Sequence, residues 1–378
     1  MANFTAFFMM KILFQSRKTL FTAPGGDTTQ ILKTKEFLEK LGCHVDITLD
    51  LEPDVSDYDI IHVFNLMRPQ ELYLQVKNAK RQNKKVALST IYGPYVEYEK
   101  KARGGFLQLL NQFLSITQIE YLKVVARAVL NAEFNKGTFF YLLHGHKRLQ
   151  RKIISLVDVF LPNSDSEMFR VASDFNMHHY NYVSVPNAVD IAKFDYDKVV
   201  IDKEYECFRD CILCVSRIEG RKNQLNIIRA VKGLPYKFVF VGKAGANFKK
   251  YYEECKNEAT NNMFFLGQID HEKLPQLYKL AKVHILASWM ETPGLSSLEA
   301  AIMRTNIVVT KKGDTEDYFG EYAFYCEPDD LTSIRNSIIQ AFKSPFRYEL
   351  LEKIRMKYKW EDTALATLQG YKLALGYE

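Results

Sequence analysis

The stretch Val283-His-Ile-Leu-Ala287, followed by Glu291-Thr-Pro-Gly-Leu-Ser-Ser-Leu-Glu299, decides the fold class of this chain. The first run is short and apolar, which is typical of a buried strand, and the Pro-Gly pair then opens a helix. A strand that feeds a helix through a glycine turn leaves backbone N–H groups free at the positive end of the helix dipole. The turn therefore predicts an anion site, and the two glutamates can reach hydroxyl groups on either side of it. A diphosphate with a sugar at each end fits this description.

The same alternation of strand and helix extends outward through both halves of the chain. The strands predicted in the first half are Ile12–Gln15, Val45–Leu49, Ile60–Phe64, Val86–Thr90 and Val157–Pro162. Those predicted in the second half are Ile212–Ser216, Phe238–Val241, Phe264–Leu266, His284–Ala287 and Ile307–Thr310. This order predicts an α/β fold with two Rossmann-like, doubly wound parallel sheets, each with its ligand edge at the strand C-termini.

A length of 378 residues favours two domains. We expect an N-terminal domain at residues 1–186, a linker at 187–203 and a C-terminal domain at 204–356. An amphipathic helix at 357–378 is expected to pack back on the N-terminal domain. Residues 1–10 are interpreted as a leader extension rather than a signal peptide, and no apolar run is long enough to predict a transmembrane helix.

The composition indicates a cytoplasmic protein with sizeable cores. Apolar residues make up 47% of the chain and charged residues 25%, which excludes general disorder. A net charge of +6 is too weak to predict nucleic acid as a partner, but it suits anionic ligands or an anionic membrane surface. Six cysteines suit a reducing compartment. Cys207, Cys211 and Cys214 are interpreted as buried thiols rather than a metal site, because a strand points the last two to opposite faces.

Two cations stand at the same predicted sheet edge as the glutamates. Arg217 follows the strand Ile212–Ser216, and Lys222 lies near the start of the next helix. A guanidinium can grip two phosphate oxygens, while an ammonium acts as a point charge. Gly242 follows the next strand, but its loop lacks the third glycine of a dinucleotide fingerprint, which counts against a nicotinamide enzyme.

These motifs resemble those of the retaining GT-B glycosyltransferases of family 4 (glycosyl transferases group 1). The resemblance rests on Ser216-Arg217, Lys222-Asn223, Gly242, Gly267 and the Glu291-x7-Glu299 pair. It implies a GT-B fold, with an acceptor-side N-terminal domain and a nucleotide-sugar-binding C-terminal domain facing a central cleft.

The resemblance also implies roles for individual residues. Arg217 and Lys222 would bind the donor diphosphate, Glu291 would face the hydroxyls of the transferred sugar, and Glu299 would bind the ribose. Arg217, Lys222 and Glu291 are therefore the predicted catalytic residues. The predicted donor-binding residues are Glu299, Gly294, Leu295, Ser296, Gly25, Gly26, Gly242 and Tyr92.

Two positions in the first half need comment. The Gly25-Gly26 loop is similar to family loops that approach the donor phosphate and acceptor, where a Cβ would block backbone contact. Tyr92 stands where the family often has a histidine, and a phenol can hydrogen-bond a sugar but cannot carry a proton as imidazole does. His62, inside a strand, is interpreted as a core histidine.

No metal or other cofactor is expected. The triplets Asp57-Tyr-Asp59 and Asp195-Tyr-Asp197 do not follow strands, so they are interpreted as surface charge. Arg217, Lys222 and the helix dipole would offset the diphosphate charge instead.

Residues 100–152 are strongly basic and carry apolar positions at helical spacing. Their cations are Lys100, Lys101, Arg103, Lys123, Arg127, Lys136, Lys147, Arg148, Arg151 and Lys152, and their apolar positions include Phe106, Leu110, Phe113, Leu114, Leu122, Val125 and Val129. One interpretation is a surface that docks on an anionic membrane carrying a lipid-linked acceptor. The other is one or two helices that pack on the N-terminal domain with a solvated basic face.

Together with these motifs, the resemblance implies a retaining hexosyltransferase. It would move a sugar from a nucleotide-diphosphate donor to a glycan or lipid-linked acceptor, in the cytoplasm or on the inner face of the membrane. Bacterial surface polysaccharide synthesis (LPS, O-antigen or capsule) is the expected setting. The alternatives are a non-catalytic sugar-nucleotide-binding subunit of the same fold and a sugar-nucleotide epimerase.

Overall fold

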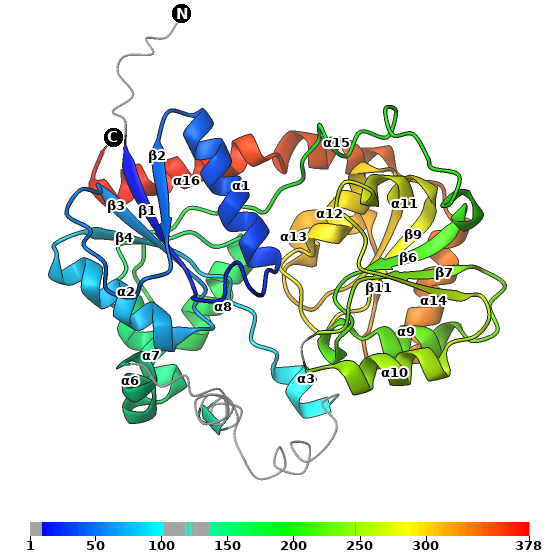
Figure 1. Cartoon of the computed structure of the whole chain (residues 1–378), viewed down its shortest axis with the longest axis horizontal. Coiled ribbons are helices and arrows are strands. Elements are labelled where there is room, and N and C mark those ends of the chain that lie inside the picture. Colours follow the sequence, from blue (N-terminus) through cyan, green and yellow to red (C-terminus); the bar gives the residue numbers. More distant parts are fainter. Residues whose placement is uncertain are drawn as a thin grey trace, which may run out of the picture. The chain divides into compact units, whose positions relative to one another are not determined.

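A computed structural model of the chain describes residues 10–101, 118, 121, 122, 125, 136–245 and 247–377 (Figure 1). The chain forms two compact units. The first holds the described residues of Met1–Pro94, Leu109–Asn187 and Trp360–Glu378, and the second those of Tyr95–Gln108 and Ala188–Lys359. The last helix thus belongs to the first unit, whereas residues 95–101, which the predicted boundaries put in the first domain, belong to the second.

The first unit is built on a five-stranded parallel sheet in the order β2-β1-β3-β4-β5. Its elements are β1 (Lys11–Gln15), α1 (Gly26–Lys40), β2 (His44–Thr48), β3 (Ile60–Phe64), α2 (Pro69–Arg81), β4 (Lys85–Ser89), α6 (Lys136–His144), α7 (His146–Ile154), β5 (Val159–Phe160), α8 (Asp165–Phe175) and α16 (Trp360–Leu375). The order reverses direction between β1 and β3, and that is where parallel α/β sheets bind ligands.

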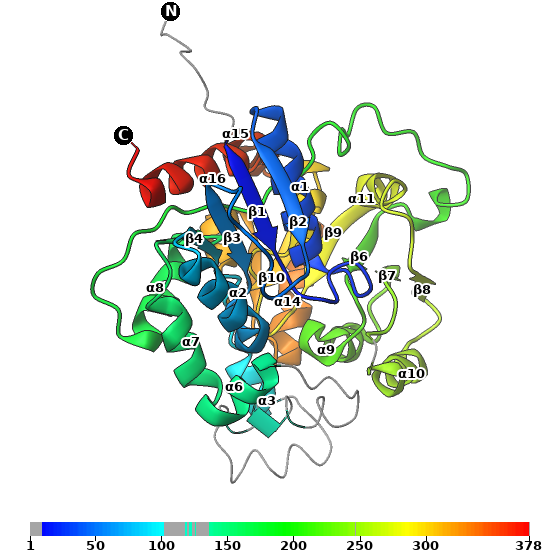
Figure 2. The ribbon, with the colours of Figure 1, turned by 60° about the vertical axis from the view of Figure 1, so that its left-hand side comes forward.

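Successive residues of β1 serve two different cores, because side chains of a strand alternate between its faces. Leu13 packs with α2, α7 and α8, whereas Ile12 and Phe14 pack with α1 and α16. Figures 1 and 2 show α1 and α16 together on one side of this sheet. Gly370 of α16 lies so close to the sheet that an added Cβ would overlap Leu161.

The second unit has a six-stranded parallel sheet in the order β11-β10-β9-β6-β7-β8. Its elements are α3 (Val96–Lys101), η1 (Glu206–Phe208), β6 (Cys211–Val215), η2 (Gly220–Lys222), α9 (Gln224–Val231), β7 (Phe238–Val241), α10 (Lys249–Glu258), β8 (Met263–Gly267), α11 (Leu274–Leu280), β9 (Ala281–Leu286), α12 (Leu295–Ile302), β10 (Asn306–Thr310), α13 (Thr315–Phe319), η3 (Gly320–Tyr322), β11 (Phe324–Cys326), α14 (Leu331–Lys343) and α15 (Tyr348–Lys357). Counted within the unit, this is the 3-2-1-4-5-6 order of dinucleotide-binding folds. Its switch point lies between β6 and β9.

The predicted fold class, two Rossmann-like parallel-sheet domains, is confirmed. The predicted strands occur within a few residues of their expected bounds, except that β5 is only two residues long and β11 was missed. β11 has three residues, two of them half-buried, so it carries little hydrophobic pattern. In the part of the chain that the structure describes, no helix is long and apolar enough to cross a membrane.

Candidate functional site

The C-terminal ends of β6 and β9 meet at the switch point of the second unit. These strands are hydrogen-bonded neighbours, so the loops that leave them lie side by side. The loops are also bonded directly: the amide of Trp289 donates to the Arg221 carbonyl at 3.0 Å, and Asn223 Nδ2 donates to the Ala287 carbonyl at 2.9 Å. Every predicted site residue of the second half lies on β6, β7, β9 or the segments that follow them.

Lys222 and Glu291 form an ion pair at this edge, Nζ to Oε1. The Lys222 side chain is 19% exposed and the Glu291 side chain 8%. Each of these two largely buried charges stabilises the other, because removing one would leave the remaining charge unpaired and poorly solvated. The pair brings together two predicted catalytic residues that are 69 positions apart in the sequence.

The backbone of Glu291 is fixed by the loop that follows β10. Its amide donates to the Lys312 carbonyl at 3.0 Å, and its carbonyl accepts from the Asp314 amide at 2.9 Å. Gly313 lies between them with φ +103°, and an added Cβ there would overlap the Glu291 backbone. The loop reads Lys311-Lys-Gly-Asp314, and its backbone contacts with Glu291 were not predicted from the sequence.

Helix α12 begins directly after Gly294, which has φ +81°. The amides of Leu295 and Ser296 open the helix, where N–H groups have no acceptor within the helix. The carboxylate of Glu291 lies beside this turn, 3.5 Å from where a Cβ on Gly294 would be. The first turn of α12 therefore offers donors next to the Lys222–Glu291 pair.

Glu299, one turn further along α12, is oriented by two side chains. His271 Nε2 lies 2.7 Å from one carboxylate oxygen, and the Tyr278 hydroxyl donates to the other at 2.9 Å. Burial, with the charge of Glu299, raises the pKa of Tyr278 well above its usual value, so the phenol stays a donor. The sequence did not reveal these two partners.

Arg217 is the exposed cation of the site. Its side chain is 42% exposed, and its nearest carboxylate oxygen, on Glu219, is 3.9 Å away. Gly242 has φ +141° and its Cα faces the Ser216 carbonyl so closely that any Cβ would overlap it. Close approach of two strand ends thus requires glycine at position 242.

His284 of β9 is buried beneath this edge. Burial, together with the charge of Lys222, lowers the pKa of His284 to about 3, so the imidazole is neutral at physiological pH. Its Nδ1 lies 3.5 Å from Ser297 Oγ, and its Nε2 has no hydrogen-bond partner among the described residues.

The segment that precedes and forms α3 packs on η2. Tyr95 Oη accepts from Arg221 Nη1 at 2.9 Å, and the two groups also stack, 5.1 Å from guanidinium carbon to ring centre. Tyr98 lies against Gly220, where an added Cβ would overlap its hydroxyl. A segment of the first half of the sequence therefore supports the turn that carries Lys222.

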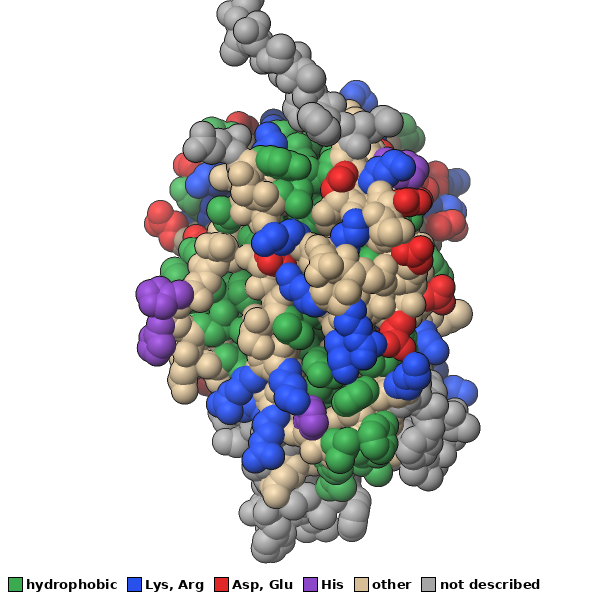
Figure 3. Space-filling model, turned by 90° about the vertical axis from the view of Figure 1, so that its left-hand side faces the viewer, with side chains coloured by type: hydrophobic (Ala, Val, Ile, Leu, Met, Phe, Trp, Pro, Cys, Tyr) green, Lys and Arg blue, Asp and Glu red, His purple; other side chains and the backbone are tan. Residues whose placement is uncertain are grey.

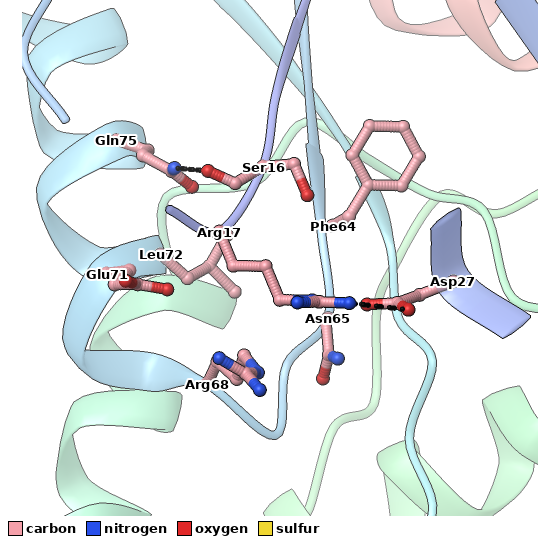
Figure 4. A pocket seen from close by; sticks show the side chains of 9 residues that line it. All are labelled: Ser16, Arg17, Asp27, Phe64, Asn65, Arg68, Glu71, Leu72 and Gln75. Atoms are coloured by element: carbon pink, nitrogen blue, oxygen red, sulfur yellow. Dashed lines mark hydrogen bonds and ion pairs between the residues drawn. The ribbon is translucent and has the colours of Figure 1, made fainter. Parts of the chain in front are cut away.

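The switch point of the first unit holds a small polar pocket, which Figure 4 shows from close by. It is lined by Ser16, Arg17, Asp27, Phe64, Asn65, Arg68, Glu71, Leu72 and Gln75. Arg17 donates through Nε and Nη2 to the two oxygens of Asp27, at 2.7 and 3.0 Å, and also to the Thr19 and Ala23 carbonyls. Burial opposes the charge of Asp27, but Arg17 holds the pKa of Asp27 below its usual value.

Arg17 thereby holds the loop that contains Gly25 and Gly26. Gly25 caps α1, and the Thr28 hydroxyl accepts from its amide at 3.0 Å. Its φ of −149° is open to any residue, so backbone strain does not explain the glycine. Arg17 was not identified as a site residue from the sequence. Its position could have indicated it, because Arg17 follows the end of β1 by two residues, just as Arg217 follows the end of β6 by two residues.

Tyr92 is placed differently from its predicted role. The residue is 5% exposed, and its hydroxyl donates to Asp174 at 2.7 Å. Its amide donates to Glu167, a fully buried carboxylate that also accepts from Thr90 and the Asn163 amide. Because burial and Asp174 raise its pKa, the phenol remains a donor to Asp174. This placement does not support the donor-binding role predicted for Tyr92.

His62 lies in the core of the first unit, as interpreted. It is 1% exposed, its Nδ1 lies 2.7 Å from the Tyr371 hydroxyl, and its Nε2 lies 2.9 Å from Ser89 Oγ. Burial lowers its pKa to about 3. The imidazole is therefore a neutral structural group that connects β3 to α16.

The aspartate triplets and the cysteines show no sign of a metal site among the described residues. Asp57 and Asp59 are exposed, Asp195 is half-buried and Asp197 is exposed. Cys211 and Cys214 are buried, and burial raises the pKa of each thiol to about 12. Cys207 is exposed, so its interpretation as a buried thiol was wrong. Among the described residues, no three His, Cys, Asp or Glu side chains gather as metal ligands would.

Part of the basic region falls outside the described residues. Its members there are Arg103, Phe106, Leu110, Phe113, Leu114, Lys123, Arg127 and Val129. Lys136, Lys147, Arg148, Arg151 and Lys152 are described and lie on α6 and α7.

The second unit of this chain is similar to a known protein family, and the chain is similar to known sequences. Residues 208–359 match the model of the family "Glycosyl transferases group 1". The chain is 23% identical over 185 residues to "O-antigen chain mannosyltransferase B" of Escherichia coli, which covers 46% of this chain and 49% of that protein. It is 25% identical over 177 residues to an uncharacterized glycosyltransferase of Methanocaldococcus jannaschii, covering 43% and 45%. The matches thus span about half the length of these curated relatives.

Solved structures show the same fold over the whole chain. Sucrose-phosphate synthase from Thermosynechococcus elongatus superposes with a TM-score of 0.69 at 16% identity, covering 97% of this chain and 99% of that one. HepE from Anabaena, solved with UDP and glucose, gives 0.66 at 14% identity, covering 95% and 98%. At these identities the likeness shows the fold alone, which is the GT-B fold of two Rossmann-like domains.

Proposed function

We propose that this chain, whose residues 208–359 match the model of the glycosyl transferases group 1 family, is a retaining glycosyltransferase. It would move a hexose from a nucleotide-diphosphate donor to a hydroxyl of a glycan or lipid-linked acceptor. The observation that carries the proposal is the Lys222–Glu291 ion pair beside the first turn of α12, with Arg217 at the end of the neighbouring strand. The name of the E. coli relative supports an acceptor in surface polysaccharide synthesis.

The cations and the helix terminus would act on the leaving group. As the bond from sugar C1 to the phosphate oxygen breaks, the diphosphate takes the electron pair and gains negative charge. Arg217, Lys222 and the amides of Leu295 and Ser296 would stabilise that charge more in the transition state than in the ground state. The proposal thus assigns the neutralisation of charge to protein groups and assigns no step to a metal.

The two glutamates would hold the ends of the donor. Glu291 would accept hydrogen bonds from the transferred sugar, and Glu299, oriented by Tyr278 and His271, would accept them from the ribose. A carboxylate whose geometry is set by neighbours loses less freedom when a ligand binds.

The acceptor oxygen would attack C1 of the oxocarbenium-like sugar on the face that the diphosphate leaves. Its proton would pass to the departing phosphate oxygen, so no protein base is required. We assign the acceptor to the first unit, near the Gly25-Gly26 loop that Arg17 holds.

Two other functions would use the same donor site. A sugar-nucleotide-binding subunit would show affinity without turnover, and an epimerase would isomerise the donor with no acceptor present. Neither is favoured by a specific feature of the described residues.

The test is a panel of UDP- and GDP-linked glucose and mannose, scored for nucleoside diphosphate release with a matched pair of variants. Arg217→Ala should lower kcat/KM about a hundredfold to a thousandfold, the range for losing one preorganised charge-stabilising donor. Arg355→Ala should leave kcat/KM unchanged, because this arginine of the same unit is equally exposed, at 45% against 42%, and pairs only with Glu352 among the described residues. Glu291→Gln keeps the side-chain shape but loses the ion pair, and should also lower kcat. If Arg217→Ala and Glu291→Gln both kept wild-type turnover, the site assignment would be wrong.

A further inference from the structure

Helices α6 and α7 of the first unit carry five cations and no carboxylate of their own. Residues 136–157 contain Lys136, Lys147, Arg148, Arg151 and Lys152 and neither Asp nor Glu. Lys136 pairs with Glu52 at 3.1 Å. Among the described residues, the four cations of α7 form no ion pair with a carboxylate. Lys152 contacts His144, Nζ to Nε2, at 2.6 Å.

The four cations of α7 lie on one face of the helix. Positions 147, 148, 151 and 152 are exposed, whereas His146, Leu149, Gln150 and Ile153 are buried against the unit. Spacing of one, four and five residues keeps side chains on one side of an α-helix. The cations therefore point outward together rather than being distributed around the helix.

Helix α6 adds exposed apolar side chains. Phe139 is 59% exposed and Leu143 is 60% exposed, and their i, i+4 spacing keeps them on one face. Figure 3, which faces this side of the first unit, shows Lys and Arg side chains gathered beside hydrophobic ones near its lower end. Exposed apolar side chains bordered by cations are compatible with an interaction surface.

We propose that this α6–α7 face docks on an anionic phospholipid bilayer. Cations alone could bind any polyanion. Burial of the Phe139 and Leu143 side chains is favourable only if the partner also offers an apolar phase. A bilayer offers lipid phosphates to the α7 cations and acyl chains to the two α6 residues. Docking would bring a lipid-linked acceptor to the enzyme. This consequence rests on the proposed function, whereas binding to the bilayer does not.

Vesicle sedimentation tests the proposal with the full chain and no sugar donor. The probes are vesicles of phosphatidylcholine alone and of equal parts phosphatidylcholine and phosphatidylglycerol. Wild-type protein should sediment only with the second. The α7 variant replaces Lys147, Arg148, Arg151 and Lys152 with Gln, and the control makes the same replacement at four exposed lysines of the second unit, Lys249, Lys250, Lys256 and Lys357.

The two variants have equal net charge, so only the place of the cations differs. At about fivefold for each cation near a bilayer surface, the α7 variant should partition about a hundredfold or more weaker, and the control should match wild type. Phe139→Ala with Leu143→Ala should weaken binding about tenfold, and this loss should persist at about 1 M salt, where the Debye length is about 3 Å. All six side chains are exposed, so unchanged thermal unfolding is expected for both sets.

Equal binding by the α7 variant and the control would overturn the proposal, because net charge alone would then explain the effect. Binding to heparin with no binding to vesicles would overturn it in favour of a soluble polyanion. Vesicle binding by a protein that turns over no sugar nucleotide would leave docking intact and refute the proposed function, so the two can fail separately.

Discussion

Replacing Gly242 with alanine should damage both the stability of the second unit and its proposed donor site. An added Cβ would overlap the Ser216 carbonyl oxygen, and it would lie 2.8 Å from the Ser216 carbonyl carbon and 3.4 Å from the Arg217 nitrogen. The amide of Gly242 donates to the Gly267 carbonyl at 2.7 Å, which limits how far the glycine can retreat. The strand end that carries Arg217 would therefore have to move.

The expected size follows from two separate costs. An L-residue held at φ +141° is strained by about 1–3 kcal/mol, and forcing a methyl group into packed backbone costs about 1–3 kcal/mol more. A combined loss of about 3 kcal/mol should lower Tm by about 6–12 °C in a unit of this size. A shift of about 1 Å at Arg217 should lower kcat/KM about a hundredfold.

Gly233→Ala is the matched control in the same unit. Gly233 also has a positive φ, +79°, but nothing lies within 4 Å of an added Cβ. It should cost only the backbone strain, about 1–2 kcal/mol, with donor turnover unchanged. Thermal unfolding and nucleoside diphosphate release would be measured on both variants. If the two unfolded at the same temperature, or Gly242→Ala kept wild-type kcat/KM, the close-approach argument would be refuted.

Three further outcomes follow from the hydrogen bonds and pKa values. Tyr278→Phe removes the hydroxyl that donates to Glu299. The loss of about 1 kcal/mol should raise the donor KM about fivefold, with little change in kcat. An unchanged KM would contradict the role of Glu299. Tyr371→Phe should cost about 1–3 kcal/mol in urea unfolding, because it leaves buried His62 short of a partner, while donor turnover stays the same; a neutral effect on unfolding would refute this. Burial lowers the pKa values of His62 and His284 to about 3, so the unfolded chain binds protons below pH ~6.5 that the folded chain does not. The stability that both histidines contribute is complete above pH ~6.5, and it should fall toward pH ~5 by about 1.4 kcal/mol per pH unit for each histidine. His62→Gln should reduce this slope of unfolding free energy against pH. An unchanged slope in that variant would count against the assignment.

Much of the architecture could be predicted because its signals are local. The run Val283–Ala287 is apolar and short, so it could be read as a strand without knowing its neighbours. Gly294 and Gly242 mark turns because their backbone conformations, at φ +81° and +141°, exclude most side chains. The Glu291-x7-Glu299 spacing could likewise be recognised from the sequence alone.

The structure alone decided what each of these residues contacts. Lys222 meets Glu291 only because β6 pairs with β9, past two intervening strands of the chain, and no local pattern specifies that pairing. The hydrogen-bond partners of Glu299 and of the Tyr92 hydroxyl also come from elements distant in the sequence. The burial of Tyr92 could therefore not be predicted, and it does not support the predicted donor-binding role.

The sequence by itself thus determined the two-sheet α/β class and the turn at Gly294, since apolar period and backbone conformation depend on residues next to one another. Tertiary structure decided the ion pair, the clamp of Arg17 on its glycine loop, and the place of residues 95–101 in the second unit. These contacts join segments far apart in the chain, and they form only where strand order and helix packing bring charges and hydroxyls within hydrogen-bonding distance.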